Sequence, residues 1–222
     1  MPHRIALFLL AALLCVASSN AQDPEIEAAV KDWRDRGGRI TQEAAGKPVL
    51  AVDLHRVSVG DGELAALGKM NQIEILDLSF TKITDASLKH LDRLPNLKLL
   101  ALHGTKISDD GLKHLASLKR LETLFLAETS ITSKGLQHLQ PLRALRNLDL
   151  DHTQVSDEGV TWLVSLTQLR RLELHHTALS DSAIPHLARL GRLQSVDLFR
   201  TRITPAGAER LQRSLPETRI TR

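Results

Sequence analysis

The chain has 222 residues, and its 29 Lys and Arg against 26 Asp and Glu give a formal net charge of only +3 at pH 7. A nearly balanced charge gives no general reason to bind nucleic acid, whose phosphates attract a concentrated basic surface. Cys15 is the only cysteine, and it lies in a segment that we predict to be removed. The mature chain would then have no disulfide, no thiolate nucleophile and no cysteine metal ligand.

The first 21 residues have the pattern of a secretory signal peptide. Arg4 supplies a positive charge, residues 5–17 are apolar, and small residues flank the bond after Ala21. The apolar run is too short to span a membrane as a helix. We therefore predict cleavage after Ala21 and a secreted or periplasmic protein without stable membrane insertion. Lipid attachment at Cys15 is the alternative, but Leu14 is bulky where a lipoprotein signal has a small residue.

The next segment is predicted to cap the N-terminal end of the domain. Residues 23–37, DPEIEAAVKDWRDRG, predict an amphipathic helix with Ile26, Val30 and Trp33 on its apolar face. A short strand at Arg39–Thr41 and a turn around Ala45–Gly46 are then expected to lead into the body of the domain.

A 24-residue unit follows in seven copies, which begin at residues 49, 73, 97, 121, 145, 169 and 193. Positions one, four and six are Ile, Leu or Val, and position nine is threonine in the last six copies. The alternation at positions four and six is typical of a strand with one buried face. The three-residue spacing of positions 16, 19 and 22 is typical of a helix. In the last six copies, Ser or Thr at position twelve suits a helix N-cap, and the aspartates that follow it in four of them suit the helix dipole.

This pattern resembles the leucine-rich repeat family, L-x-x-L-x-L-x-x-N/C-x-L, with threonine in the N/C slot. The second half of each unit, as in TKISDDGLKHLASLKR, resembles the T-D-x-G-L-x-x-L variant common in exported bacterial repeat proteins. The resemblance implies an α/β solenoid fold and a general role in recognition.

Physical reasoning leads to the same solenoid. One unit cannot cover its own apolar face, so neighbouring units must stack and share a core. Strands pack about 4.8 Å apart whereas helices need about 10 Å, so the array should curve with its parallel strands on the concave face. The predicted organisation is a signal peptide at residues 1–21, a helix and strand cap at 22–48, seven repeats at 49–216 and a capping strand at 217–222.

Positions three, five and seven are predicted to face outward from the concave sheet. Together they carry six acidic residues and one basic residue, Arg171. This polarity argues against a phosphate-binding groove and against a nucleic-acid partner, and it favours a protein or peptide partner of basic character. The predicted partner-binding residues are Asp53, Asp77, Phe125, Asp149, Asp151, Arg171, Glu173, His175, Asp197 and Phe199.

A cation site on the same face is the main alternative. Asp149, Glu173 and Asp197 should lie about 5 Å apart on adjacent strands, so that one or more of them should bind a proton or a cation more readily than usual. The side chains of Asp151, His152, His175 and His176 should be nearby. Positions seven and eight are expected to diverge, however, and the histidine spacing matches no zinc motif. We therefore predict no metal and no cofactor, and cation-dependent binding stays open as an alternative.

A second histidine column occupies position eighteen, and it is assigned a structural role. Its members lie on the helical side, where neighbouring units are too far apart to share a metal: His90, His114, His138 and His186. The chain also has no G-x-S-x-G elbow, phosphate loop, dinucleotide fingerprint or H-E-x-x-H motif. We predict a binding protein rather than an enzyme, with a structural part in a cell-envelope assembly as a further alternative.

Overall fold

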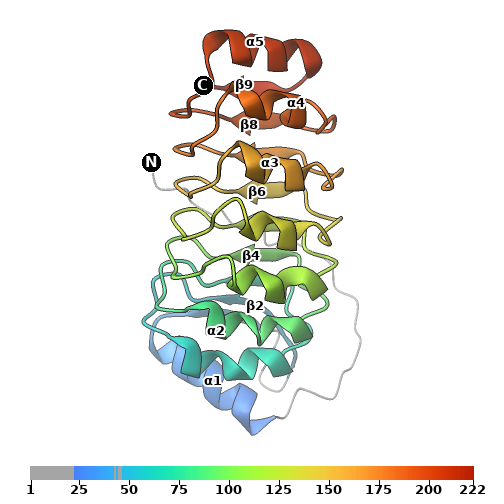
Figure 1. Cartoon of the computed structure of the whole chain (residues 1–222). Coiled ribbons are helices and arrows are strands. Elements are labelled where there is room, and N and C mark those ends of the chain that lie inside the picture. The colour runs from blue at the N-terminus through green and yellow to red at the C-terminus, as the bar shows by residue number, and fades with distance from the viewer. Residues whose placement is uncertain (1–22, 43, 45–46) are drawn as a thin grey trace.

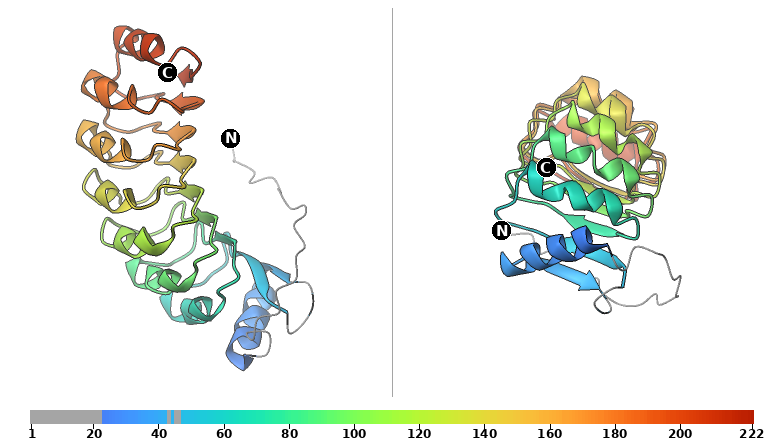
Figure 2. Two further views of the ribbon diagram at one scale, coloured as in Figure 1. Left: turned by 90° about the vertical axis from the view of Figure 1, so that its right-hand side faces the viewer. Right: turned by 90° about the horizontal axis from the view of Figure 1, so that it is seen from below.

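A computed structural model describes residues 23–42, 44 and 47–222. The predicted signal peptide and the turn at Ala45–Gly46 lie outside the described residues. Within them the chain forms a curved stack in which strands line the concave side and helical segments line the other side (Figures 1 and 2). The α/β solenoid expected from the repeats is thus confirmed.

One nine-stranded sheet runs the length of the stack in sequence order, β1 to β9. β1 and β2 are antiparallel, and every later pair is parallel. The register advances by one repeat per strand, so that Leu76, Leu100 and Leu124 are successive partners. The strands are β1 Arg39–Gln42, β2 Val49–Asp53, β3 Ile75–Asp77, β4 Leu99–Ala101, β5 Thr123–Phe125, β6 Asn147–Asp149, β7 Arg171–Glu173, β8 Ser195–Asp197 and β9 Arg219–Thr221.

Half of the ten helical segments in the described residues are 3₁₀-helices, and those between the strands are short. A 3₁₀-helix rises about 2.0 Å per residue and so covers more distance with fewer residues than an α-helix, which suits a 24-residue unit. The segments are α1 Pro24–Asp35, η1 Asp61–Lys69, α2 Asp85–Leu88, η2 Leu91–Arg93, η3 Gly111–Ser117, η4 Gly135–Leu139, α3 Asp157–Leu163, η5 Asp181–Ala183, α4 Ile184–Leu187 and α5 Pro205–Ser214. None of the helices in the described part of the chain is long and apolar enough to cross a membrane.

A single apolar core runs from one end of the stack to the other. The leucines at positions four and six are fully buried in it, and α1 adds Ile26, Val30 and Trp33 at the N-terminal end. At the other end α5 buries Leu211, and β9 pairs with β8. Each end of the core is therefore covered by an element outside the regular strand–helix pattern.

The threonine at position nine has a structural function in the turn. Thr105 donates its hydroxyl to the carbonyl oxygen of Leu102 at 2.6 Å, and the other five threonines repeat this bond at 2.6–2.7 Å. The bond satisfies a carbonyl group just after the strand, where an unpaired polar group would be costly to bury. Threonine is small enough to do this in the interior.

Position eight has left-handed backbone geometry in all seven repeats. The φ angles lie between 54° and 60°, and only one of these residues is glycine: Arg56, Phe80, Gly104, Glu128, His152, His176 and Arg200. A single non-glycine residue in this region costs on the order of 1 kcal/mol. Because every repeat has the same conformation, the conformation belongs to the architecture of the turn rather than to one site.

Aspartates at position thirteen join each repeat to the next. Asp109 accepts hydrogen bonds from the backbone N–H of Thr132 at 2.8 Å and from its hydroxyl at 2.5 Å. The same pair of bonds is made by Asp61, Asp85, Asp157 and Asp181. Ser133 interrupts this series, and its hydroxyl oxygen accepts from the N–H of Ser156 at 2.9 Å. The sequence predicted only a helix-dipole role for these acids, whereas the structure shows that they also form hydrogen bonds between neighbouring repeats.

Candidate functional site

The acidic residues at position five lie in register on the concave face. Asp149, Glu173 and Asp197 are successive partners on β6, β7 and β8, and all three are half-buried. Asp53 and Asp77 form a second pair on β2 and β3. Ala101 and Phe125 separate the two groups, so the predicted acid column is divided rather than continuous.

The aspartates at position five also complete the strand ends. Asp77 is 7% exposed and accepts the N–H of Ser79 at 2.8 Å, so the expectation that it belongs to an exposed binding surface is wrong. Asp53, Asp149 and Asp197 accept the equivalent N–H two residues later at 2.8–3.0 Å. One carboxylate oxygen of each therefore has a structural partner.

Asp151 at position seven is the carboxyl group that favours a proton. Burial and the charge of Asp149 raise its pKa from 3.8 to about 7, against a hydrogen bond from the N–H of His175 that lowers it. That bond is 2.7 Å long, and Glu173 and Asp197 add further repulsion. The sequence predicted a proton or cation on this face, and the structure assigns the raised pKa to Asp151.

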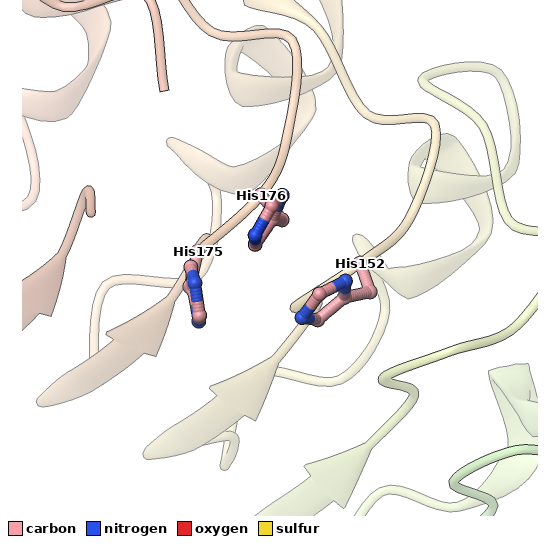
Figure 3. A group of neighbouring side chains, drawn as sticks. All are labelled: His152, His175 and His176. Carbon is pink, nitrogen blue, oxygen red and sulfur yellow. The ribbon is translucent and has the colours of Figure 1, made fainter. Parts of the chain in front are cut away.

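Three histidines meet beside Asp151 at the turns that follow β6 and β7 (Figure 3). Each of His152, His175 and His176 offers a nitrogen, and these atoms lie within 4.8 Å of one another. Their ring centroids are 4.4–5.1 Å apart. The expectation that positions seven and eight diverge is wrong here. His152 and His176 both have left-handed backbone geometry at position eight of the turn. The expectation assumed that the extended geometry of the strand continues to position eight.

The surroundings of His175 and His176 favour the neutral form of these two rings. Burial, followed by the nearby His152, lowers the pKa of both His175 and His176. Arg200 lies 2.7 Å from Nε2 of His176 and can only donate there, so this nitrogen accepts. Nε2 of His175 is buried without a hydrogen-bond partner among the described residues.

The predicted aromatic contact residues differ in exposure. Phe199 is 44% exposed, packs 5.2 Å from His175 by ring centroids and lies under the guanidinium of Arg200. Phe125 is half-buried and stacks on His103 at 5.2 Å. Phe199 is thus the more accessible of the two for contact with a partner.

A basic hollow lies over the N-terminal ends of β6 to β9, where the sequence predicted a single base. Its volume is about 480 Å³, and it is lined by Glu122, Arg146, Asn147, Arg170, Arg171, Gln194, Ser195 and Arg219. Arg146 and Arg170 occupy position two, which lies outside the predicted concave positions three, five and seven. Consecutive arginines in that column were the signal that could have revealed it.

The histidines of position eighteen do not form a comparable cluster. Among the residues described, the only group of three or more possible ligands is that of His152, His175 and His176. His114 instead lies 3.7 Å from Asp92 of the preceding repeat. The structural role of the column stays a prediction.

Comparisons with known proteins agree with the repeat architecture. Residues 95–155 match the family model described as leucine rich repeat. The crystal structure of internalin C2 from Listeria monocytogenes is similar over 90% of this chain and 92% of that chain, with a TM-score of 0.58 and 22% sequence identity. At this identity the similarity concerns the fold. Among curated proteins, none matches this chain.

Proposed function

Because the chain is a leucine-rich-repeat protein, we propose that it is a non-enzymatic scaffold that binds a protein or peptide through its concave face. Solenoids present extended concave surfaces suited to such partners, whereas catalysis prefers an enclosed pocket. The predicted signal peptide supports a periplasmic or extracellular location for this activity.

The opposite charges at the two ends of β6 to β8 are the observation that carries this proposal. Asp149, Glu173 and Asp197 lie at the C-terminal ends of these strands, and Arg146 and Arg170 line the hollow at the N-terminal ends. Position two and position five are about 10 Å apart along a strand. A complementary partner segment would place a basic group over the carboxylates and an acidic group over the hollow.

Phe199 would supply the apolar part of the same surface. Large aromatic side chains provide much of the binding energy at protein interfaces when a partner covers them. Phe199 lies two residues after the end of β8 and is 44% exposed in the free chain. The charged groups would then set the orientation and the association rate of the partner.

The test begins with a partner captured from the extracellular or envelope fraction, identified and purified. Titration calorimetry then measures partner binding by the wild type and by two double variants. One combines Asp149→Asn and Glu173→Gln, and the other combines Arg146→Gln and Arg170→Gln. Each should weaken binding at least about tenfold, and added salt should weaken binding by the wild type.

Lys119→Gln with Lys134→Gln is the matched control, since both lysines are exposed and neither lines the basic hollow. This double variant should bind as the wild type does. The proposal would be contradicted if neither the acidic nor the arginine double variant changed the affinity for the partner. It would also be contradicted if only the lysine variant changed it.

A further inference from the structure

We propose that His152, His175 and His176 form a binding site for one divalent transition-metal cation, with zinc as the best-suited ion. The site lies at one margin of the concave face, at the turns after β6 and β7 (Figure 3). It requires no partner, so the proposal is independent of the scaffold function.

The present geometry needs only side-chain adjustment to hold zinc. Zn–N bonds of 2.0–2.1 Å in a tetrahedron put ligand nitrogens about 3.4 Å apart, and the three nitrogens here lie within 4.8 Å. His152 is exposed and His175 and His176 are only partly buried, so small rotations of the rings can close this gap. The turns after β6 and β7 already bring the three side chains together (Figure 3).

The buried Nε2 of His175 is a second, independent sign of a ligand. It has no hydrogen-bond partner among the described residues, although buried polar atoms are rarely left without one. A cation bound to Nε2 would satisfy it. On the opposite side of the ring, Nδ1 of His175 lies 4.0 Å from Oδ2 of Asp151, which is too long for a hydrogen bond. A small rotation of the ring would bring the two atoms into contact, and the carboxylate could then orient the ring as carboxylates orient metal-binding histidines.

The charges around the cluster favour a cation, with one exception. Asp149 and Asp197 interact electrostatically with the ring of His175, and both also interact with Asp151. Arg200 opposes them, and its contact with Nε2 of His176 leaves Nδ1 as the nitrogen available for a metal unless the exposed guanidinium moves away.

The ligand set selects the class of metal. Imidazole nitrogens suit zinc, copper and nickel, whereas calcium and magnesium require oxygen ligands. Three protein ligands also leave a fourth position of the tetrahedron open to water or to a group from another molecule.

Zinc alone, titrated by calorimetry into the full chain purified without a polyhistidine tag, tests this proposal. We expect one zinc ion per chain and no heat with calcium. His152→Gln should weaken zinc binding at least about tenfold. Changing a residue that only hydrogen-bonds to a metal ligand already weakens binding by about 10- to 100-fold, so removing a ligand itself should cost no less. His55→Gln is the control, because His55 occupies position seven of the first repeat and lies outside the cluster; it should leave zinc binding unchanged.

Nitrogen-15 NMR of the imidazole groups in the wild-type chain gives a readout that does not depend on variants folding. One equivalent of zinc should shift the ring nitrogens of His152, His175 and His176 and leave those of His55 in place. Absence of zinc binding, unshifted resonances of these three rings, or equal binding by His152→Gln would overturn the proposal.

Discussion

Carboxylates occupy two regions of this molecule and behave differently in each. At position thirteen, each aspartate receives hydrogen bonds from the next repeat, and bonds from the N–H and hydroxyl of Thr204 lower the pKa of Asp181. Burial opposes ionisation of Asp61, but hydrogen bonds from Ser87 and Thr84 outweigh it and lower its pKa. On the concave face, Asp151 is buried beside Asp149 and its pKa is raised to about 7.

The comparison shows that the neighbours of a carboxylate determine its role. A carboxylate surrounded by donors is stable when charged and joins the repeats. A carboxylate surrounded by other acids retains an unfavourable charge that a proton, a cation or a basic partner can relieve. The first region links neighbouring repeats, and the second is where we propose that a ligand binds.

The largest effect should come from filling the space beside a position-thirteen aspartate. A Cβ at Gly135 would lie 2.2 Å from Oδ1 of Asp109 and 3.1 Å from its Cα. Gly135→Ala should therefore displace Asp109 from Thr132 and lower the free energy of unfolding by about 3 kcal/mol. Urea denaturation measures this change.

Gly191→Ala is the control for that substitution, since a Cβ there meets no atom within 4 Å. Its effect should stay within about 0.5 kcal/mol. Equal losses from the two alanine substitutions would show that position-thirteen contacts contribute little to the stack.

The second prediction concerns the pH dependence of stability in the metal-free protein. Because the folded pKa of Asp151 is above its ordinary value, the folded chain binds more protons than the unfolded chain between about pH 4 and pH 7, and stability falls as pH rises through that window. Asp151→Asn should remove this loss while its amide oxygen still accepts from the N–H of His175. At pH 8 the variant should be more stable by about 1–2 kcal/mol, a figure reduced for the partial solvent exposure of the carboxyl.

Asp181→Asn should change the pH dependence of stability in the opposite direction from Asp151→Asn. The folded pKa of Asp181 is lowered, so its contribution is present above the unfolded pKa and is lost as pH falls through the folded pKa. The asparagine variant should therefore be less stable than the wild type at pH 7 and should approach it in acid. Thermal unfolding of the wild type and the two variants across pH 3–8 tests both predictions. The titration of histidines is common to all three chains, so it cancels when the stability of a variant is subtracted from that of the wild type. Parallel pH profiles for wild type and Asp151→Asn would contradict the raised pKa.

The smallest effect should come from completing the series of aspartates. Ser133→Asp places a carboxylate where Ser156 offers an N–H and a hydroxyl, and Gly159 leaves the same space that Gly135 leaves for Asp109. The variant should be more stable by about 0.5–1 kcal/mol, measured by urea denaturation. Ser130→Asp, at an exposed site elsewhere in the same repeat, should not stabilise the chain. A destabilised Ser133→Asp would show that the interruption is needed where it stands.

The repeat period was sufficient to predict the solenoid and part of the candidate site. A strict 24-residue spacing puts the same position of every copy on the same side of the stack, so Leu76 and Leu100 had to share one interior. The same spacing aligned Asp149, Glu173 and Asp197. These features follow from periodicity alone, because the register of a parallel stack is fixed by the length of its unit.

Other features depended on contacts that the sequence does not encode locally. The left-handed backbone of His152 and His176 turns both side chains toward His175, and no glycine marks those positions. The raised pKa of Asp151 depends on its burial and on its distance from Asp149, and the hollow depends on how Arg146 and Arg170 pack at the strand ends. The sequence by itself determined which positions repeat, whereas only the tertiary structure decided which side chains of neighbouring repeats come close enough to change each other's charge.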